Sequence, residues 1–187
     1  MKKFLMTIAA AFVAVSMNAQ LYLGGSLGFG SWSTQKLLGD KSEAVFSILP
    51  EIGYNLNDQW AIGTVIGYQN NKFNNVVNID GVNVAGHEAA FTFNPYARFS
   101  YLKAGSVNLF IDGGVDFSSA TKGDCTYLGF GFKPGVAINL NDKFSFVSHL
   151  GFVGYQLVNP DGDDNNTSYF GLDMSGANLT FGLYYNF

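Results

Sequence analysis

The sequence predicts an all-β protein, an eight-stranded antiparallel up-and-down transmembrane β-barrel, and three observations support this prediction. First, the 187 residues include only 13% charged residues but 16% aromatic residues and 23 glycines, which excludes a disordered chain. Second, apolar and polar residues alternate through eight segments, as strands with two different faces require. Third, no stretch beyond the N-terminal segment has 18 consecutive apolar residues, so a membrane-embedded chain must cross as a closed sheet.

The N-terminal segment has the pattern of a secretory signal peptide. Two lysines precede an apolar run from Phe4 to Val15, and Ala19 is the expected cleavage position. The run is too short for a spanning helix, which needs about 20 residues, and no Cys follows the cleavage position to carry a lipid. We therefore expect a signal peptide at residues 1–19 and the β-barrel domain at residues 20–187. The mature chain has 8 Lys and Arg against 14 Asp and Glu, a net charge of −6, which argues against a nucleic-acid partner.

Each of the eight segments has an apolar face without charged residues. The sixth segment is the clearest, with apolar residues at Leu128, Phe130, Phe132, Pro134, Val136, Ile138 and Leu140. The opposite face is polar, but most of its residues are small and few are charged. A solvated surface normally carries about 25–35% charged residues, so this face is better explained as an enclosed lumen. A soluble β-sandwich or a lipocalin-like barrel is the alternative.

Short and long connections alternate along the chain. Short turns are predicted at residues 55–59, 102–106 and 141–143, and longer polar loops at residues 33–43, 70–88, 118–126 and 156–168. Outer-membrane barrels have short periplasmic turns and longer external loops, so we expect both termini in the periplasm. Aromatic residues beside the short turns match an interfacial girdle: Tyr54, Trp60, Tyr101, Phe144 and Tyr185.

An internal repeat surrounds two of the short turns. Residues 50–60 align without gaps to residues 134–144, and each copy begins at a proline and passes through an Asn-Asp pair. Pro95 begins a looser third copy. Because proline cannot donate to a strand ladder, prolines at matching depth predict a repeated local device such as a β-bulge at Pro50, Pro95 and Pro134.

These features resemble the small outer-membrane β-barrel family of Gram-negative bacteria, of the OmpX/OmpA-barrel type. The Pro-x-Ile-Gly-Tyr-x-Leu-Asn-Asp stretch and the Asn-Ala-Gln end of the leader are similar to Bacteroidetes-type members of this porin family. The resemblance implies contact with outer-membrane lipid and lipopolysaccharide. It also implies a C-terminal signal for the barrel-assembly machinery, formed by Phe181, Leu183, Tyr185 and Phe187. It does not imply one function, because the family includes adhesion-related, structural, porin-like and enzymatic barrels.

Charged residues on the polar face form the candidate site. Four of them, with a histidine as a further member, are predicted to face inward at similar depth: Glu51, Arg98, Asp112, Lys133 and His149. Arg98 and Asp112 should lie on the paired strands of one hairpin. An unpaired charge in a closed lumen is costly, so opposite charges should pair. Because an eight-stranded barrel is just wide enough to be filled by its own side chains, a structural plug is favoured over a gate for small solutes.

Catalysis and metal binding are not expected. Some small barrels are lipid A-modifying enzymes that use Ser and His, but Ser148 and His149 are adjacent on a strand and must point to opposite faces. The acidic stretch 161–165 resembles the start of a calcium loop, but the Gly and the bidentate Glu that such a loop requires are missing. No cofactor is expected. Cys125 is predicted in an external loop, and as the one cysteine it cannot form an intrachain disulfide.

The sequence thus favours a monomeric, non-enzymatic protein with a side-chain-filled lumen. Its role would be structural, or it would interact with other surfaces through its external loops. The alternative is a narrow porin-like channel for small polar solutes, and a lipid-modifying barrel enzyme is less favoured. The loop sequences identify neither a ligand nor an external partner.

Overall fold

The computed structural model describes residues 20–34, 41–79, 82–121, 125–160, 167–174 and 179–187. The predicted signal peptide and the acidic stretch 161–165 lie outside the described residues. The strands are β1 (Leu21–Thr34), β2 (Lys41–Asn55), β3 (Trp60–Ile79), β4 (Val82–Ala104), β5 (Val107–Ala120), β6 (Cys125–Asn139), β7 (Phe144–Leu150), β8 (Phe152–Pro160), β9 (Thr167–Asp173) and β10 (Leu179–Asn186). Within the described ranges, no helix is long and apolar enough to cross a membrane.

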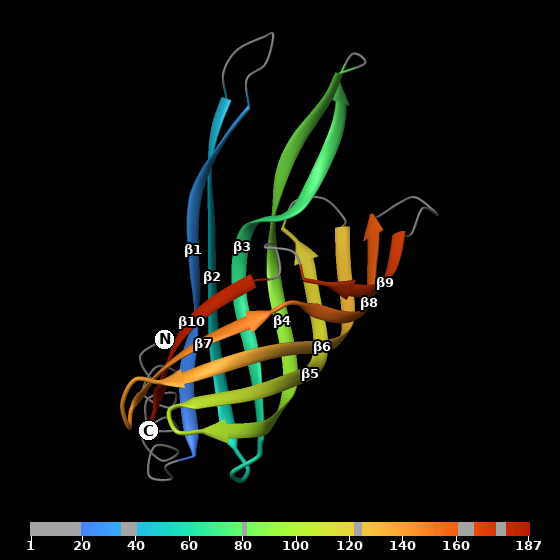
Figure 1. Cartoon of the computed structure of the whole chain (residues 1–187). Helices are drawn as coiled ribbons and strands as arrows, with labels where there is room; N and C mark the ends of the chain where they lie inside the picture. The colour runs from blue at the N-terminus through green and yellow to red at the C-terminus, as the bar shows by residue number, and fades with distance from the viewer. Residues whose placement is uncertain (1–19, 35–40, 80–81, 122–124, 161–166, 175–178) are drawn as a thin grey trace, which may run out of the picture.

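These strands form a closed eight-stranded antiparallel barrel, which confirms the predicted fold class (Figure 1). Strands β1 to β6 pair in sequence, and β6 pairs with both β7 and β8. β7 and β8 are two parts of the seventh wall strand, separated at Gly151. β9 pairs with β8, and β10 pairs with β7 and then with β1, so these two strands make up the eighth wall and close the barrel.

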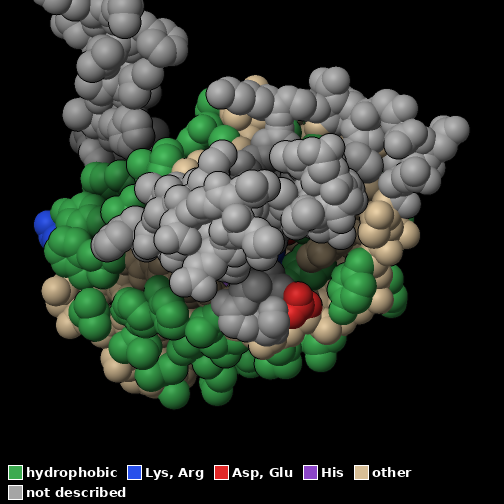
Figure 2. Space-filling model, turned by 90° about the horizontal axis from the view of Figure 1, so that it is seen from above, with side chains coloured by type: hydrophobic (Ala, Val, Ile, Leu, Met, Phe, Trp, Pro, Cys, Tyr) green, Lys and Arg blue, Asp and Glu red, His purple; other side chains and the backbone are tan. Residues whose placement is uncertain are grey.

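The two faces of the wall have the predicted orientation. Apolar side chains are exposed on the outside, for example Leu27 at 76% and Phe91 at 63%, while Glu51, Arg98 and Asp112 are buried inside. Viewed from above, hydrophobic side chains make up most of the described outer wall (Figure 2). This arrangement is the reverse of a soluble protein, in which water contacts the polar face.

The two repeated turns have the same hydrogen bonds. Asn57 Oδ1 accepts hydrogen bonds from the backbone N–H groups of Gln59 and Trp60, both at 2.9 Å. Asn141 Oδ1 accepts the equivalent bonds from the N–H groups of residues 143 and 144, again at 2.9 Å. An Asn side chain commonly organises a tight turn in this way, which explains why the repeat extends through the Asn-Asp pair. The third turn instead uses Gly105 at a φ of +60°, a conformation that favours glycine.

The first strand of the barrel begins, and the chain ends, beside these turns. The backbone N–H of Phe187 donates to the Leu21 carbonyl over 3.0 Å, so the start of β1 and the C-terminus lie at the short-turn end. The predicted girdle residues lie there as well. The ring centroids of Trp60 and Phe99 are 4.8 Å apart, and Phe144 and Tyr185 meet edge to face at 5.3 Å.

The predicted external loops are too long, and the loop at residues 70–88 is wrong. β3 continues to Ile79 and β4 begins at Val82, with a register shift between Gln69 and Phe73. Cross-strand pairing therefore extends well beyond the barrel wall. The asparagines in this stretch suggested a loop, but β-branched residues such as Val76 and Val84 favour strand once a partner strand is available.

The other three predicted loops are also longer than the connections in the structure. β1 runs to Thr34 and β2 begins at Lys41, while the later strands occupy most of residues 118–126 and 156–168. Cys125 was placed in a loop, but it is the first residue of β6 and pairs in register with Pro160. Polar strand ends that extend past a membrane resemble loops in a hydrophobicity pattern, because no buried face imposes alternation on them.

The predicted proline bulge occurs at one of three positions. Lys133 and Pro134 lie opposite three residues, Leu150 to Phe152, so the seventh wall strand bulges there. Pro95 pairs with Thr64 in an unbroken register. Pro50 also keeps its register and lies opposite Gly25. Gly25 has a φ of +142°, and a Cβ there would lie 2.4 Å from the Leu49 carbonyl. A glycine opposite Pro50 thus provides the space that a bulge was expected to supply.

Candidate functional site: the charged lumen

Arg98 lies at the centre of the lumen and holds two carboxylates. It projects from β4 directly opposite Asp112 on β5. Its Nε is 2.7 Å from Asp112 Oδ1 and its Nη2 is 2.8 Å from Oδ2, a bidentate geometry typical of strong ion pairs. The same Nη2 is 3.5 Å from Oε1 of Glu51, on β2. All three side chains are buried, so each charge depends on its partners rather than on water.

Aromatic rings enclose the guanidinium group. Its carbon lies 4.0 Å from the ring centroid of Phe110, and between 5.2 and 5.7 Å from those of Tyr22, Tyr96 and Tyr184. These distances are within the range of cation–π attraction. Tyr96 and Tyr184 also donate hydrogen bonds to Glu51. We refer to this assembly as the Arg98 cluster, composed of Tyr22, Glu51, Tyr96, Arg98, Phe110, Asp112 and Tyr184.

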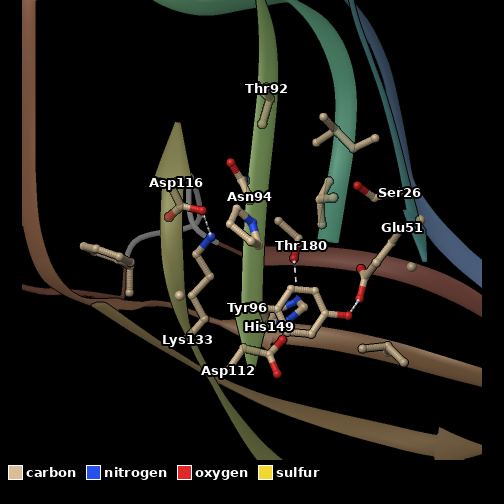
Figure 3. Close-up of a pocket in the computed structure, with 18 of the residues that line it drawn as sticks. Ser26, Glu51, Thr92, Asn94, Tyr96, Asp112, Asp116, Lys133, His149 and Thr180 are labelled. Carbon is tan, nitrogen blue, oxygen red and sulfur yellow. Dashed lines mark hydrogen bonds and ion pairs between the residues drawn. The ribbon is translucent and has the colours of Figure 1, made fainter. Parts of the chain in front are cut away.

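His149 joins this cluster, but Lys133 does not. His149 Nε2 is 2.7 Å from Asp112 Oδ2, and its Nδ1 is 3.2 Å from the Thr180 hydroxyl. Lys133 lies in register opposite Asp112, yet its Nζ donates to Asp116 at 2.6 Å (Figure 3). Both Asp112 oxygens are already occupied by Arg98 and His149. The structure thus brings together four of the five predicted residues and gives Lys133 a separate partner.

The Arg98 cluster lies between two cavities. A cavity of about 240 Å³ lies on the side of the long hairpins and is lined by Glu51, Tyr96 and Asp112 among others. A second cavity of about 400 Å³ lies on the side of the short turns and is lined by Tyr22 and Arg98. Tyr184 lines both. Residues of the cluster therefore line both cavities.

The chemistry available in the described lumen is limited. No group of three His, Cys, Asp or Glu residues in the described part of the chain could hold a metal ion. His149 faces the lumen, whereas its neighbour Ser148 pairs in register with the outward-facing Phe181. Ser148 Oγ is buried and has no hydrogen-bond partner among the described residues. As predicted, the two residues point to opposite faces and do not form a nucleophile–base pair.

The sequence prediction did not include Phe110 and Asp116 in the lumen network. It also did not predict that tyrosines enclose Arg98. Phe110 is fully buried at the centre of the cluster, although it is apolar on the face that was read as polar. Its position between the outward-facing Leu109 and Ile111 was the available signal. Asp116 was not among the charged residues selected from the sequence. It is four residues after Asp112, so it projects on the same face of the strand.

Comparisons with known proteins agree with this architecture. In fold, the chain is similar to Neisserial surface protein A (NspA) from Neisseria, with 16% identity and a TM-score of 0.52, over 91% of this chain and 98% of that one. It is also similar to the outer membrane protein OprG from Pseudomonas aeruginosa, with 13% identity and a TM-score of 0.51, over 90% and 96%. Identities this low support the fold alone. No curated protein matches the chain.

The family comparison covers nearly the whole sequence. The profile of the outer membrane protein β-barrel domain matches residues 4–187. The closed eight-stranded barrel, its apolar outer face and its charged lumen are consistent with that match. The chain therefore belongs to the outer membrane protein β-barrel domain family.

Proposed function

We propose that this protein is a monomeric, non-enzymatic barrel of the outer membrane whose lumen is blocked and whose external hairpins interact with other surfaces. Family membership and the exposed apolar face support the location. Outer-membrane lipid and lipopolysaccharide would contact that face. The barrel-assembly machinery would read the C-terminal signal that ends at Phe187 during insertion, and residues 1–19 would direct export.

The blocked lumen rests on one observation, the position of the Arg98 cluster between the two cavities. Arg98 is held by two carboxylates and lies against four aromatic rings. Phe110 is 0% exposed and Arg98 7%, so side chains fill this level of the barrel. A solute would pass only if the bidentate pair opened, which would leave buried charges without partners.

The surface role is supported by the two hairpins that rise beyond the barrel wall (Figure 1). β1 and β2 remain paired as far as Thr34 and Lys41, and β3 and β4 as far as Ile79 and Val82. β2 and β3, in contrast, pair no further than Ser47 and Gln69. The two hairpins therefore separate above this level. Strand edges of this kind can pair with a strand of another protein.

The non-enzymatic assignment is supported by the position of the lumen histidine. The hydrogen bonds of His149 in the lumen are to Asp112 and Thr180, and Ser148 projects from the opposite face of the same strand. A lipid-modifying enzyme of the Ser–His type would need these two groups within hydrogen-bond distance of one another.

Planar-bilayer conductance tests the blocked lumen. We expect the wild-type protein to give no steady openings, and we expect Arg98→Ala to give measurable leak because Glu51 and Asp112 would repel each other. Lys143→Ala is the control, since Lys143 lies in a short turn outside the cluster. Steady openings of the wild type that change with Arg98 substitution would contradict the proposal and would favour a narrow channel for small polar solutes.

A further inference from the structure

The barrel wall is open on one side above the short-turn half. β1 pairs with β2 from Leu21 to Thr34, but its described register with β10 ends at Leu23. β9 pairs with β8, and no pair between described residues joins β9 to β1. In Figure 1, β1 rises at the left, β8 and β9 rise at the right, and β10 ends between them. We call the gap that begins at Gly25 of β1 and Gly182 of β10 the side opening.

The cavity on the hairpin side of the Arg98 cluster reaches this side opening. Its volume is about 240 Å³, and its lining includes Ser26 of β1 and both Thr180 and Phe181 of β10. Phe181 is 54% exposed on the outer face, so it borders both the cavity and the outside of the wall. In Figure 3, Ser26 lies on one side of the cavity and the Lys133–Asp116 pair on the other. The cavity therefore extends from this ion pair to the outer face.

A bilayer imposes two conditions on the side opening. Leu27, two residues beyond Gly25, is 76% exposed on the outer face, so the opening begins at the level of the apolar band. Hydrocarbon offers no hydrogen-bond partner to an open sheet edge or to polar side chains. The inside of the opening therefore needs a polar occupant, whereas its outside needs an apolar one. An amphiphile meets both conditions when its head group lies in the cavity and its chain lies in the lipid.

The cavity lining supplies contacts for both parts of such a molecule. Leu49, Phe152 and Phe181 provide apolar surface along the cavity. The rings of Tyr96 and Tyr184 line the same space. Aromatic rings attract cations, and quaternary ammonium ligands are commonly recognised in this way. A cationic head group is therefore compatible with the aromatic part of the lining.

The charge of the lumen also favours a cationic head group. Among the described residues, the ionised groups that line this cavity or bind its carboxylates are three acids and two bases: Glu51, Asp112, Asp116, Arg98 and Lys133. Three negative charges against two positive charges leave a net charge of −1 when His149 is neutral. One added positive charge would balance this sum, whereas an anionic head group would add an uncompensated charge. The Asp116 side chain is 12% exposed, so it is the carboxylate that a head group can reach.

From this juxtaposition we propose that the hairpin-side cavity binds a single-chain amphiphile with one positive charge, which enters from the lipid through the side opening. The head group lies beside Asp116, and the chain passes between Ser26 and Phe181 into the bilayer. The inference goes beyond the proposed surface role. It rests on the proposed location in the outer membrane but not on the blocked lumen, because binding is measured independently of conductance.

Photolabelling of the full-length protein in phosphatidylcholine nanodiscs tests the site, at about pH 8, where an unperturbed histidine is neutral. The probe is an alkyltrimethylammonium with a diazirine in its chain, and mass spectrometry identifies the labelled peptides. Labelling should saturate, should include β1 and β10 beside the side opening, and should be displaced by dodecyltrimethylammonium. Dodecyl sulfate and dodecanol should not displace it. Tetramethylammonium should displace it at least about tenfold less well, because it lacks the chain that lipid holds.

Two charge variants should shift binding in opposite directions. Asp116→Asn should weaken it by about tenfold or more, because the reachable carboxylate is lost. Lys133→Met should strengthen it by about threefold or more, because a competing cation is removed. Asp58→Asn is the matched control, since Asp58 lines the cavity on the short-turn side, and it should leave binding unchanged. Loss of structure cannot produce opposite shifts, and melting temperatures establish that each variant is folded.

A steric variant tests the entry route. Ser26→Trp places a large ring at the side opening and should reduce labelling by about tenfold or more. Ser100→Trp is the same substitution in the short-turn cavity, and it should leave labelling unchanged.

The proposal fails if the folded wild type in nanodiscs is not labelled saturably, or if dodecyl sulfate displaces the probe as well as the cation does. It also fails if the two charge variants shift binding in the same direction, or if Ser26→Trp is labelled as strongly as Ser100→Trp. Equal displacement by tetramethylammonium would overturn entry from the lipid. A protein that inserts into the bilayer without binding would overturn this inference alone. A protein that stays folded and soluble without detergent would overturn the proposed location as well.

Discussion

The short-turn half and the hairpin half of the barrel are built differently. In the short-turn half, two turns share one hydrogen-bonding pattern and the chain ends pair beside them. In the hairpin half, the seventh and eighth wall strands are each divided. The described register of β1 with β10 consists of two residue pairs, at Tyr22 and Leu23 near the short turns, and does not extend into the hairpin half. By contrast, β1 pairs with β2 from Leu21 to Thr34.

The two halves differ in how strongly their contacts fix the structure. The Arg98 cluster and the short turns hold the first half, because buried charges and tight turns tolerate few alternatives. The second half has fewer complete ladders. Local stability in proteins follows such differences in packing and hydrogen bonding. Substitutions of comparable size should therefore destabilise the first half more than the second.

The largest effect is expected from Arg98→Ala. The substitution leaves Glu51 and Asp112 buried and uncompensated, and breaking a buried pair typically costs about 3–5 kcal/mol. Urea unfolding in detergent would measure the loss in the free energy of unfolding. Lys133→Met provides the comparison, because its pair with Asp116 is one-third exposed on the lysine side and partly exposed pairs contribute about 0–1 kcal/mol. An unchanged melting temperature of Arg98→Ala would count against the plug.

A smaller effect is expected from Gly53→Ala. A Cβ at residue 53 would lie 2.1 Å from the Tyr22 ring, which packs in the Arg98 cluster, and such overpacking typically costs about 1–3 kcal/mol. Gly28→Ala is the matched change in the hairpin half, where the Cβ would meet the rotatable Ser47 hydroxyl at 2.6 Å. We expect it to cost less than about 0.5 kcal/mol. Equal losses in thermal melts would show that the two halves do not differ in this way.

The smallest effect is expected at the repeated turn. Asn57→Ala removes the acceptor for two backbone N–H groups, and because this turn is exposed, water can replace part of the loss. The expected cost is about 1 kcal/mol, measured as a shift in the urea midpoint. Asp58→Ala should change stability by less than about 0.5 kcal/mol, since the side chain of Asp58 has no hydrogen bond to another described residue. A larger loss from Asp58→Ala than from Asn57→Ala would reverse the role assigned to the two residues.

The sequence predicted the barrel wall better than the strand extensions beyond it. The alternating pattern located the wall strands except for β9, and it gave most of their faces, because a strand between lipid and a polar lumen repeats its chemistry every second residue. The same pattern gave the opposition of Arg98 and Asp112. It failed beyond the wall, where the sequences of the extensions of β3 and β4 are rich in asparagine and were predicted as a loop. It also failed to predict the partner of Lys133, which depends on which oxygens of Asp112 are already occupied.

The sequence by itself determined an all-β chain with an apolar outer face, short turns at one end and charged residues inside, because periodicity and turn chemistry are local properties. The tertiary structure alone decided that Phe110 and three tyrosines enclose Arg98, that His149 joins the cluster while Lys133 pairs with Asp116, and that the cluster lies between two cavities. Those contacts join side chains from strands far apart in the chain. Their geometry is set by how the barrel closes, and no local pattern records it.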